Sequence, residues 1–157
     1  MLLRPALVLT ALLVALPSAA RAQLLDTKAI ALDGARRMMA AAEAEARRNG
    51  WTVSIAIVDA MGELLLFQRL DDAPPSSIAV SQAKARTAAR FRRPTKALED
   101  AVAGGRAALL SFDGVTMVEG GVPVVVGGKV IGAIGVSGVT SAQDALVAQA
   151  GVAALRP

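Results

Sequence analysis

The stretch Glu119–Gly138, EGGVPVVVGGKVIGAIGVSG, decides the fold of this chain. Two apolar runs, Val122–Val126 and Val130–Val136, lie on either side of a glycine pair at 127 and 128. β-branched residues favour strands, and a two-residue glycine loop between two such runs is typical of a β-hairpin. The stretch therefore predicts a strand, a tight turn and a second strand in the central, buried part of a sheet.

Glycines interrupt the second of these strands. Gly132 and Gly135 alternate with branched residues and leave part of the strand surface without side chains. Glycine weakens a strand, so its presence indicates that another backbone or a ligand comes close. The residues alone leave both alternatives open: a helix packed tightly on the sheet, or a ligand lying against it.

The first 22 residues have the composition of an export signal. A basic start at Arg4 precedes the apolar run Ala6–Leu16, and small residues follow up to an A-x-A site that ends at Ala22. The run is too short to span a bilayer, and the pattern is typical of a secretory signal peptide. We expect cleavage after Ala22, a mature domain over 23–157, no membrane segment in the mature form, and a periplasmic or secreted location.

Composition excludes several function classes. The formal net charge of +4 loses two positive charges with Arg4 and Arg21, and the remaining charge is too small to indicate nucleic-acid binding. With no histidine and no cysteine, the chain lacks the residues of structural zinc sites, copper sites, and Ser-His-Asp or Cys-His catalytic sets. Any acid or base must be a carboxylate or a lysine such as Lys84.

Helical spacing and turn residues divide the rest of the mature chain. They predict a helix from a cap at Asp26 or Thr27 to Arg48, strands over 51–58 and 63–70, helices over 78–91 and from Thr95 to about Ala103, and a closing helix over 141–155 capped by Thr140 or Ser141. This order predicts an antiparallel sheet between helices, an α+β fold in one domain. Alanine-rich outer helices permit close packing between subunits, so we expect a homo-oligomer.

Three local patterns have both a chemical and a structural interpretation. Asp59 and Glu63 flank a turn. They are either an acid–base pair or turn residues, since an aspartate at the start of a turn bonds to its own backbone. Ser81 and Lys84 fit S-x-x-K, although the companion motifs S-D-N and K-T-G are absent. A basic cluster is either a solvated face or a grip for carboxylates and phosphates; it comprises Arg86, Arg90, Arg92, Arg93 and Lys96.

Three blocks, taken in order, resemble the GlcG/HbpS-like haem-binding, or haem-degrading, domain family. They are VSIAIVDAMGELLLFQRLDDA at 53–73, KARTAARFRRPT at 84–95, and the stretch at 119–138 followed by Asp144. The resemblance implies a profilin-like fold, a five-stranded antiparallel sheet flanked by helices, often assembled into rings or octamers. Members of the family are similar to extracellular haem-binding proteins tied to redox sensing, to a protein of a glycolate-utilisation operon, and to a domain fused to corrinoid adenosyltransferases.

Some members of that family bind haem through a histidine near the start of the domain, a ligand that this chain lacks. From the family blocks and the methionines of the first helix, the candidate ligand-binding residues are Lys84, Thr87, Arg93, Gly120, Gly121, Met38 and Met39. Their structural alternative is maintenance of the fold: a lysine paired with a carboxylate, turn glycines and methionines that fill the core. We assign no catalytic or metal-binding residue.

The leading expectation is an exported protein that binds a small molecule, haem or a related tetrapyrrole, as a scavenger, store or sensor accessory. One alternative is a small enzyme acting on an organic acid or a tetrapyrrole, with Lys84, Asp59 or Asp144 as acid–base groups. Another is an interaction module whose oligomeric ring is its function.

Overall fold

A computed structural model describes residues 27–155, so the predicted signal peptide and cleavage site lie outside the described residues. Four antiparallel strands form one sheet in the order β2-β1-β4-β3. The strands are β1 (Ser54–Asp59), β2 (Leu64–Arg69), β3 (Gly121–Val126) and β4 (Lys129–Ser137). The helices are α1 (Leu32–Arg48), α2 (Ser77–Phe91), α3 (Thr95–Ala103) and α4 (Ser141–Ala153), with a short 3₁₀ turn η1 (Ala107–Ser111). The predicted α+β single domain is confirmed.

The β3–β4 hairpin is the one that the sequence predicts. Val126 is paired with Lys129 across the turn. Gly127 and Gly128 between them have φ angles of 58° and 76°, which is the backbone that a two-residue hairpin turn of the primed type requires. β4 then pairs with β1, so the glycine-bearing strand lies in the middle of the sheet.

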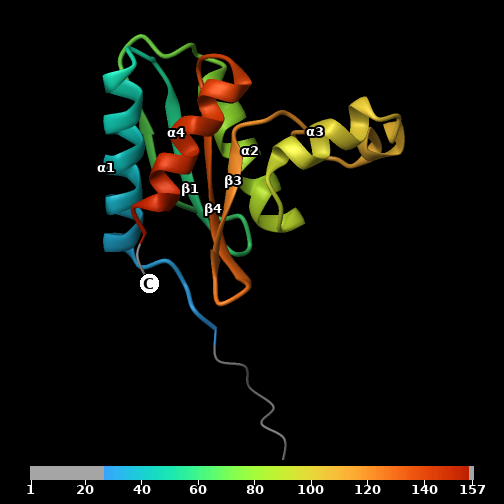
Figure 1. Ribbon diagram of the computed structural model, residues 1–157, viewed down its shortest axis with the longest axis horizontal. Helices are drawn as coiled ribbons and strands as arrows, with labels where there is room; N and C mark the ends of the chain where they lie inside the picture. The colour runs from blue at the N-terminus through green and yellow to red at the C-terminus, as the bar shows by residue number, and fades with distance from the viewer. Residues whose placement is uncertain (1–26, 156–157) are drawn as a thin grey trace, which may run out of the picture.

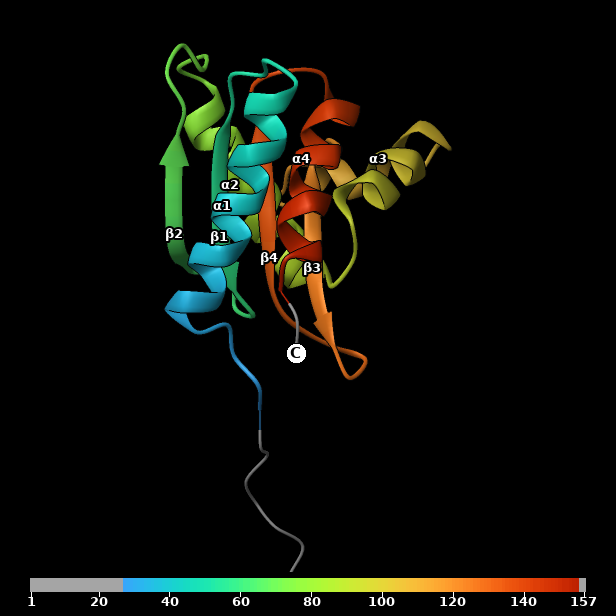
Figure 2. The same ribbon diagram turned by 60° about the vertical axis from the view of Figure 1, so that its left-hand side comes forward.

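Helices cover both faces of the sheet, as Figures 1 and 2 show. The larger core lies between the sheet and the pair α1 and α4, and it contains Met38, Ile55 and Ile134, all fully buried. The opposite face carries α2 alone, packed through small residues: Ala56, Ala85, Ala88, Ala89 and Ala133. The two faces therefore differ in thickness, with large side chains under two helices and alanines under one.

Close packing of α2 explains a glycine of β4. A Cβ atom placed on Gly135 would lie 2.2 Å from the carbonyl oxygen of Ser81 and 2.4 Å from the amide nitrogen of Ala85. Only a residue without a side chain permits this approach of helix backbone to strand. Of the two alternatives that the sequence left open, the packed helix is the correct one here.

Two sequence-based expectations are wrong. The resemblance implied five strands, whereas residues 27–155 form four, and the segment between α3 and β3 forms η1 and turns. The first helix begins at Leu32 after Ala31, not after a cap at 26 or 27. Residues 27–31 run outside the helix and bury Ile30, whose side chain lies where a Cβ of Gly132 would be.

α3 and η1 form an arm that projects from the three-layer body (Figure 1). None of the η1 residues is buried, and α3 buries only Thr95 and Leu98. None of the helices within residues 27–155 is long and apolar enough to cross a membrane.

Candidate functional site

A pocket of about 380 Å³ lies at the start of α1, between the segment before that helix, the β3–β4 hairpin and the chain just after α4. This volume falls within the range of roughly 300–1,000 Å³ that is usual for small-molecule sites. It is lined by Lys28, Ala29, Ile30, Ala31, Asp33, Gly34, Arg37, Val126, Ile131 and Leu155. The pocket thus joins three parts of the chain that are far apart in sequence.

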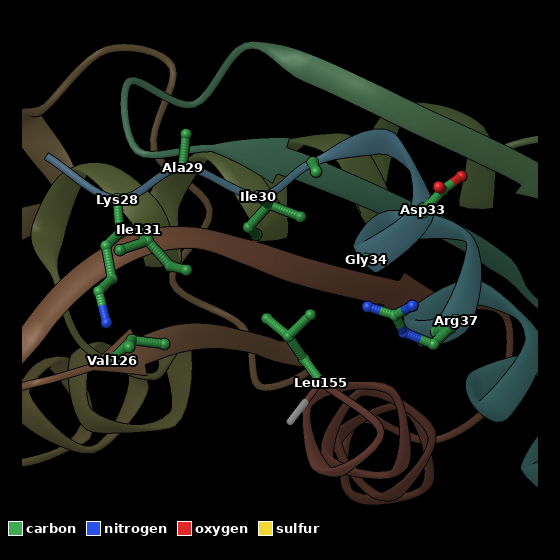
Figure 3. Close-up of a pocket in the computed structure, with 10 residues that line it drawn as sticks. Lys28, Ala29, Ile30, Asp33, Gly34, Arg37, Val126, Ile131 and Leu155 are labelled. Atoms are coloured by element: carbon green, nitrogen blue, oxygen red, sulfur yellow. The ribbon is translucent and has the colours of Figure 1, made fainter. Parts of the chain in front are cut away.

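The pocket combines an apolar middle with positive ends. Figure 3 shows the Lys28 amine at one end and the Arg37 guanidinium at the other, with Leu155 between them. Within residues 27–155, neither cation has an ion-pair partner. Asp33 points away from the middle and pairs with Arg36 at 3.1 Å instead. This arrangement suits an apolar molecule that carries acidic groups on its edge.

The predicted residue Lys84 lies elsewhere, at a closed position. Its Nζ donates to Oδ2 of Asp144 at 2.8 Å, and each side chain is only 2% exposed. α2 and α4, which carry them, cover opposite faces of the sheet, and the two side chains meet beside Gly120. A Cβ on Gly120 would lie 2.8 Å from Nζ of Lys84 and 2.9 Å from Cβ of Asp144. Because Gly120 has no side chain, the side chains of Lys84 and Asp144 have room to meet beside it.

Burial and hydrogen bonding oppose each other at Asp144. Removal from water raises the pKa of this carboxyl, while the hydrogen bond and charge of Lys84 and the backbone N–H of Val139 lower it. The Val139 amide donates to Oδ1 at 3.3 Å, so both carboxylate oxygens are occupied. Nζ of Lys84 and both carboxylate oxygens of Asp144 thus have partners inside the protein, as the structural alternative for Lys84 describes.

Of the other candidate ligand-binding residues, some lie near the Lys84–Asp144 ion pair and some lie far from it. Thr87, one turn after Lys84, is buried, and its hydroxyl accepts from the Thr116 amide at 3.0 Å. Gly121 donates its amide to the Thr95 hydroxyl at 2.9 Å. Thr95 therefore anchors the start of β3 instead of capping α3, whose cap position is Pro94. Arg93 is exposed, and within the described residues its side chain bonds only to the Phe91 carbonyl, at 3.3 Å.

Met38 and Met39 lie on α1 in the larger core, on the other face of the sheet from α2. Their exposed fractions are 0% and 4%, so neither sulfur reaches solvent or the pocket lining. The structure does not bring the two methionines together with Lys84, Thr87 and the glycines. The predicted residues form two separate groups and one exposed arginine.

Side chains from each of the three local patterns have partners within the protein. Oδ1 of Asp59 accepts from the amides of Met61 at 2.8 Å and Glu63 at 2.9 Å, as expected for an aspartate that starts a turn. Arg90 donates to the Met61 carbonyl at 2.9 Å and pairs with Glu63 at 3.2 Å. The Ser81 hydroxyl donates to the Ile78 carbonyl at 3.3 Å, and Lys84 has Asp144 as its partner.

No motif in the sequence predicts the pocket. Ile30 belonged to the segment expected to be helical, and Arg37 lay on the expected wet side of the first helix. Leu155 ends the closing segment and has no motif around it. The only available signal was a lone basic residue, Lys28, before an apolar one. Lys28 can be recognised as part of a pocket only once the hairpin and both ends of the domain lie together.

Comparison with known proteins gives consistent relatives. The family model described as haem degrading protein HbpS-like matches residues 30–153. The protein GlcG of Escherichia coli strain K12 is 52% identical over 103 residues, which is 66% of this chain and 77% of GlcG. The family match includes the sheet, both helical layers and most of the pocket lining.

Solved structures agree with this comparison. A double mutant of HbpS from Streptomyces reticuli is 34% identical with a TM-score of 0.81, over 91% of this chain and 99% of that one. A PduOC:heme complex is 30% identical with a TM-score of 0.75, over 82% of this chain and 96% of that one.

Proposed function

Because this chain belongs to the HbpS-like haem-degrading protein family, we propose that it binds haem or a related tetrapyrrole in the pocket at the start of α1. The ligand class is supported by a relative, PduOC, crystallised with haem. The location is carried by one observation: the pocket has an apolar middle and a cation without an ion-pair partner, within the described residues, at each end.

The side chains of the pocket fit the periphery of a tetrapyrrole. Its macrocycle is flat and apolar, and Ile30, Ile131 and Leu155 offer apolar contact. Its propionates are carboxylates, for which a guanidinium such as Arg37 is a geometrically matched partner and the amine of Lys28 a point-charge partner. The pocket is partly open, so one edge of the macrocycle would remain in solvent.

The side chains that line the pocket include few that could coordinate the haem iron. The chain has no histidine or cysteine, and no methionine lines the pocket. Among the lining side chains, Lys28 carries the amine that could act as a ligand, while Asp33 points away. Affinity should therefore come from the macrocycle and the propionates, and iron-free protoporphyrin IX should bind about as well as haemin.

A paired titration tests this proposal. Haemin and protoporphyrin IX are titrated against the purified protein, followed by their absorption and by quenching of Trp51, the single tryptophan. We expect saturable binding of one molecule per chain, weakened about tenfold by Arg37→Glu, which corresponds to about 1.4 kcal/mol. The matched control, Arg106→Glu, makes the same charge change on the exposed segment before η1. Non-saturable binding, or equal effects of the two variants, would contradict the pocket.

We further propose that the mature form is residues 23–157 and that it works outside the cytoplasm, as a scavenger, store or sensor accessory. The support is the composition of residues 1–22: a basic start, a short apolar run and an A-x-A site. Intact mass of the protein recovered from periplasm and medium gives the test. A chain that keeps Met1 in those fractions, or that stays wholly in the cytoplasm, would count against export.

A further inference from the structure

β2 is an open edge of the sheet. The strand order places it outermost next to β1, and Figure 2 shows no element beyond it. Its sequence, LLLFQR, begins with four apolar residues, and none of the six is buried. Leu64 is 48% exposed. An exposed apolar edge strand is a template for pairing with another strand.

Backbone groups along this edge point outward. The amide of Leu70 donates to the Val53 carbonyl at 3.0 Å, so Leu70 faces β1. In an antiparallel ladder, successive residues alternate between facing the partner and facing away. Phe67 and Arg69 therefore direct their N–H and C=O groups away from β1, and within residues 27–155 no turn or loop backbone bonds to them.

The opposite edge is protected in two ways. β3 contains Pro123, which has no N–H to offer to a further strand. The hydroxyl of Thr95 already accepts from the amide of Gly121 at the start of β3. β2 has neither proline nor lysine. The two edges of one sheet thus differ, which indicates that only the β2 edge is available for pairing.

We propose that β2 pairs antiparallel with β2 of a second copy of this chain, forming an eight-stranded sheet across a two-fold axis near Phe67. The charges at the ends of the strand favour a second copy in this orientation. Glu63 precedes the strand and Arg69 ends it, and both are exposed. Antiparallel pairing brings the acidic start of each strand near the basic end of the other, within reach of long side chains.

The present partners of these two residues do not prevent this pairing. Glu63 pairs with Arg90 at 3.2 Å in an exposed bridge, and exposed bridges contribute little. Arg69 bonds to the Ala73 carbonyl at 2.7 Å on its own chain. A guanidinium has five donors, so it can keep this bond and also receive a carboxylate.

A matched pair of edge substitutions gives the first test. Leu64→Lys adds a charge to the open edge, and Val125→Lys makes the same change at a residue that is 54% exposed on the protected edge. Molar mass is measured by light scattering or sedimentation over a concentration series, with circular dichroism to establish folding. We expect a dimer, or an even-numbered oligomer, whose mass is halved by Leu64→Lys and unchanged by Val125→Lys.

A charge exchange gives the second test and does not depend on the first. Glu63→Arg alone and Arg69→Glu alone each place like charges together at both ends of the interface, so each should raise the dimer dissociation constant several-fold. The double variant Glu63→Arg/Arg69→Glu should restore it, which a merely structural effect would not do. A monomer at tens of micromolar, or an oligomer indifferent to Leu64→Lys and to the charge exchange, would overturn the proposal.

Discussion

Lys84 and Asp144 form an ion pair, 2.8 Å between Nζ and Oδ2, that joins helices on opposite faces of the sheet. Sixty residues separate them along the chain, and each side chain is almost fully buried. A buried ion pair is costly to desolvate, so it adds little net stability, but removing one partner leaves an uncompensated buried charge. Here the pair links α2 to α4 at the point where Gly120 leaves room.

Breaking this pair from one side should be strongly destabilising. Lys84→Met leaves a buried carboxylate without its cation, and Asp144→Leu leaves a buried ammonium, so each should lower the free energy of unfolding by about 3–5 kcal/mol. The double variant Lys84→Met/Asp144→Leu removes both charges and should lie much closer to the wild type. Urea unfolding followed by Trp51 fluorescence measures all four proteins. Additive single effects in the double variant would refute the coupling.

The stability of the Lys84→Met variant should increase as the pH falls, which is opposite to the usual contribution of a carboxylate. Burial raises the pKa of Asp144 in the folded protein, and Lys84 supplies the main opposing effects. Without Lys84, the raised pKa means that the folded state holds its proton more tightly than the unfolded state does. Stability from this group is then fully present below the unfolded pKa, about 3.9, and is lost as pH rises through the folded pKa.

Unfolding midpoints measured from neutral pH down to about pH 4, near the unfolded pKa, test this sign. Lys84→Met should gain stability as the pH falls, whereas Lys84→Met/Asp144→Leu should not show that gain. A Lys84→Met variant whose acid response matches that of the double variant would show that Asp144 becomes solvated once its partner is removed.

Tight packing of α2 on β4 should make Gly135 intolerant of a methyl group. In Gly135→Ala the new Cβ would meet helix backbone at Ser81 and Ala85, which cannot rotate away as a side chain could. Overpacking of this kind lowers stability by about 1–3 kcal/mol, sometimes more. Gly104→Ala is the control, because its nearest neighbour would be at 3.2 Å and its φ is −77°. Thermal unfolding of the two variants should differ clearly, and equal melting temperatures would contradict the packing.

Features encoded by neighbouring residues could be predicted from the sequence. The glycine turn at 127 and 128 and the Asp59 turn depend on a few adjacent residues, and both are as expected. The cap of α4 is also local: the Thr140 hydroxyl accepts from the Gln143 amide, and the Gln143 side chain accepts from the Thr140 amide. The β3–β4 hairpin followed directly from the alternation of apolar runs and glycines.

Features that depend on distant residues could not be predicted. Lys84 was identified as a candidate, but nothing in its surroundings pointed to Asp144 as its partner. The start of α1 was misplaced because burial of Ile30 against β4 outweighs the local capping preference of Thr27. The pocket needs Lys28, Arg37 and Leu155 in one place, and only the assembled sheet and helices bring them there.

The core position of Met38 and Met39 leads to a last prediction, which separates two locations for a bound tetrapyrrole. Met38→Leu and Met39→Leu nearly conserve volume, so each should cost less than about 1.5 kcal/mol of stability. Neither sulfur lines the pocket, so haemin bound there should keep the same Soret maximum and affinity in both variants. Arg37→Glu, by contrast, should weaken haemin binding while leaving unfolding almost unchanged, because its side chain is exposed. A Soret shift in Met38→Leu would mean that the iron reaches the core side of α1, which would require that helix to move from the sheet.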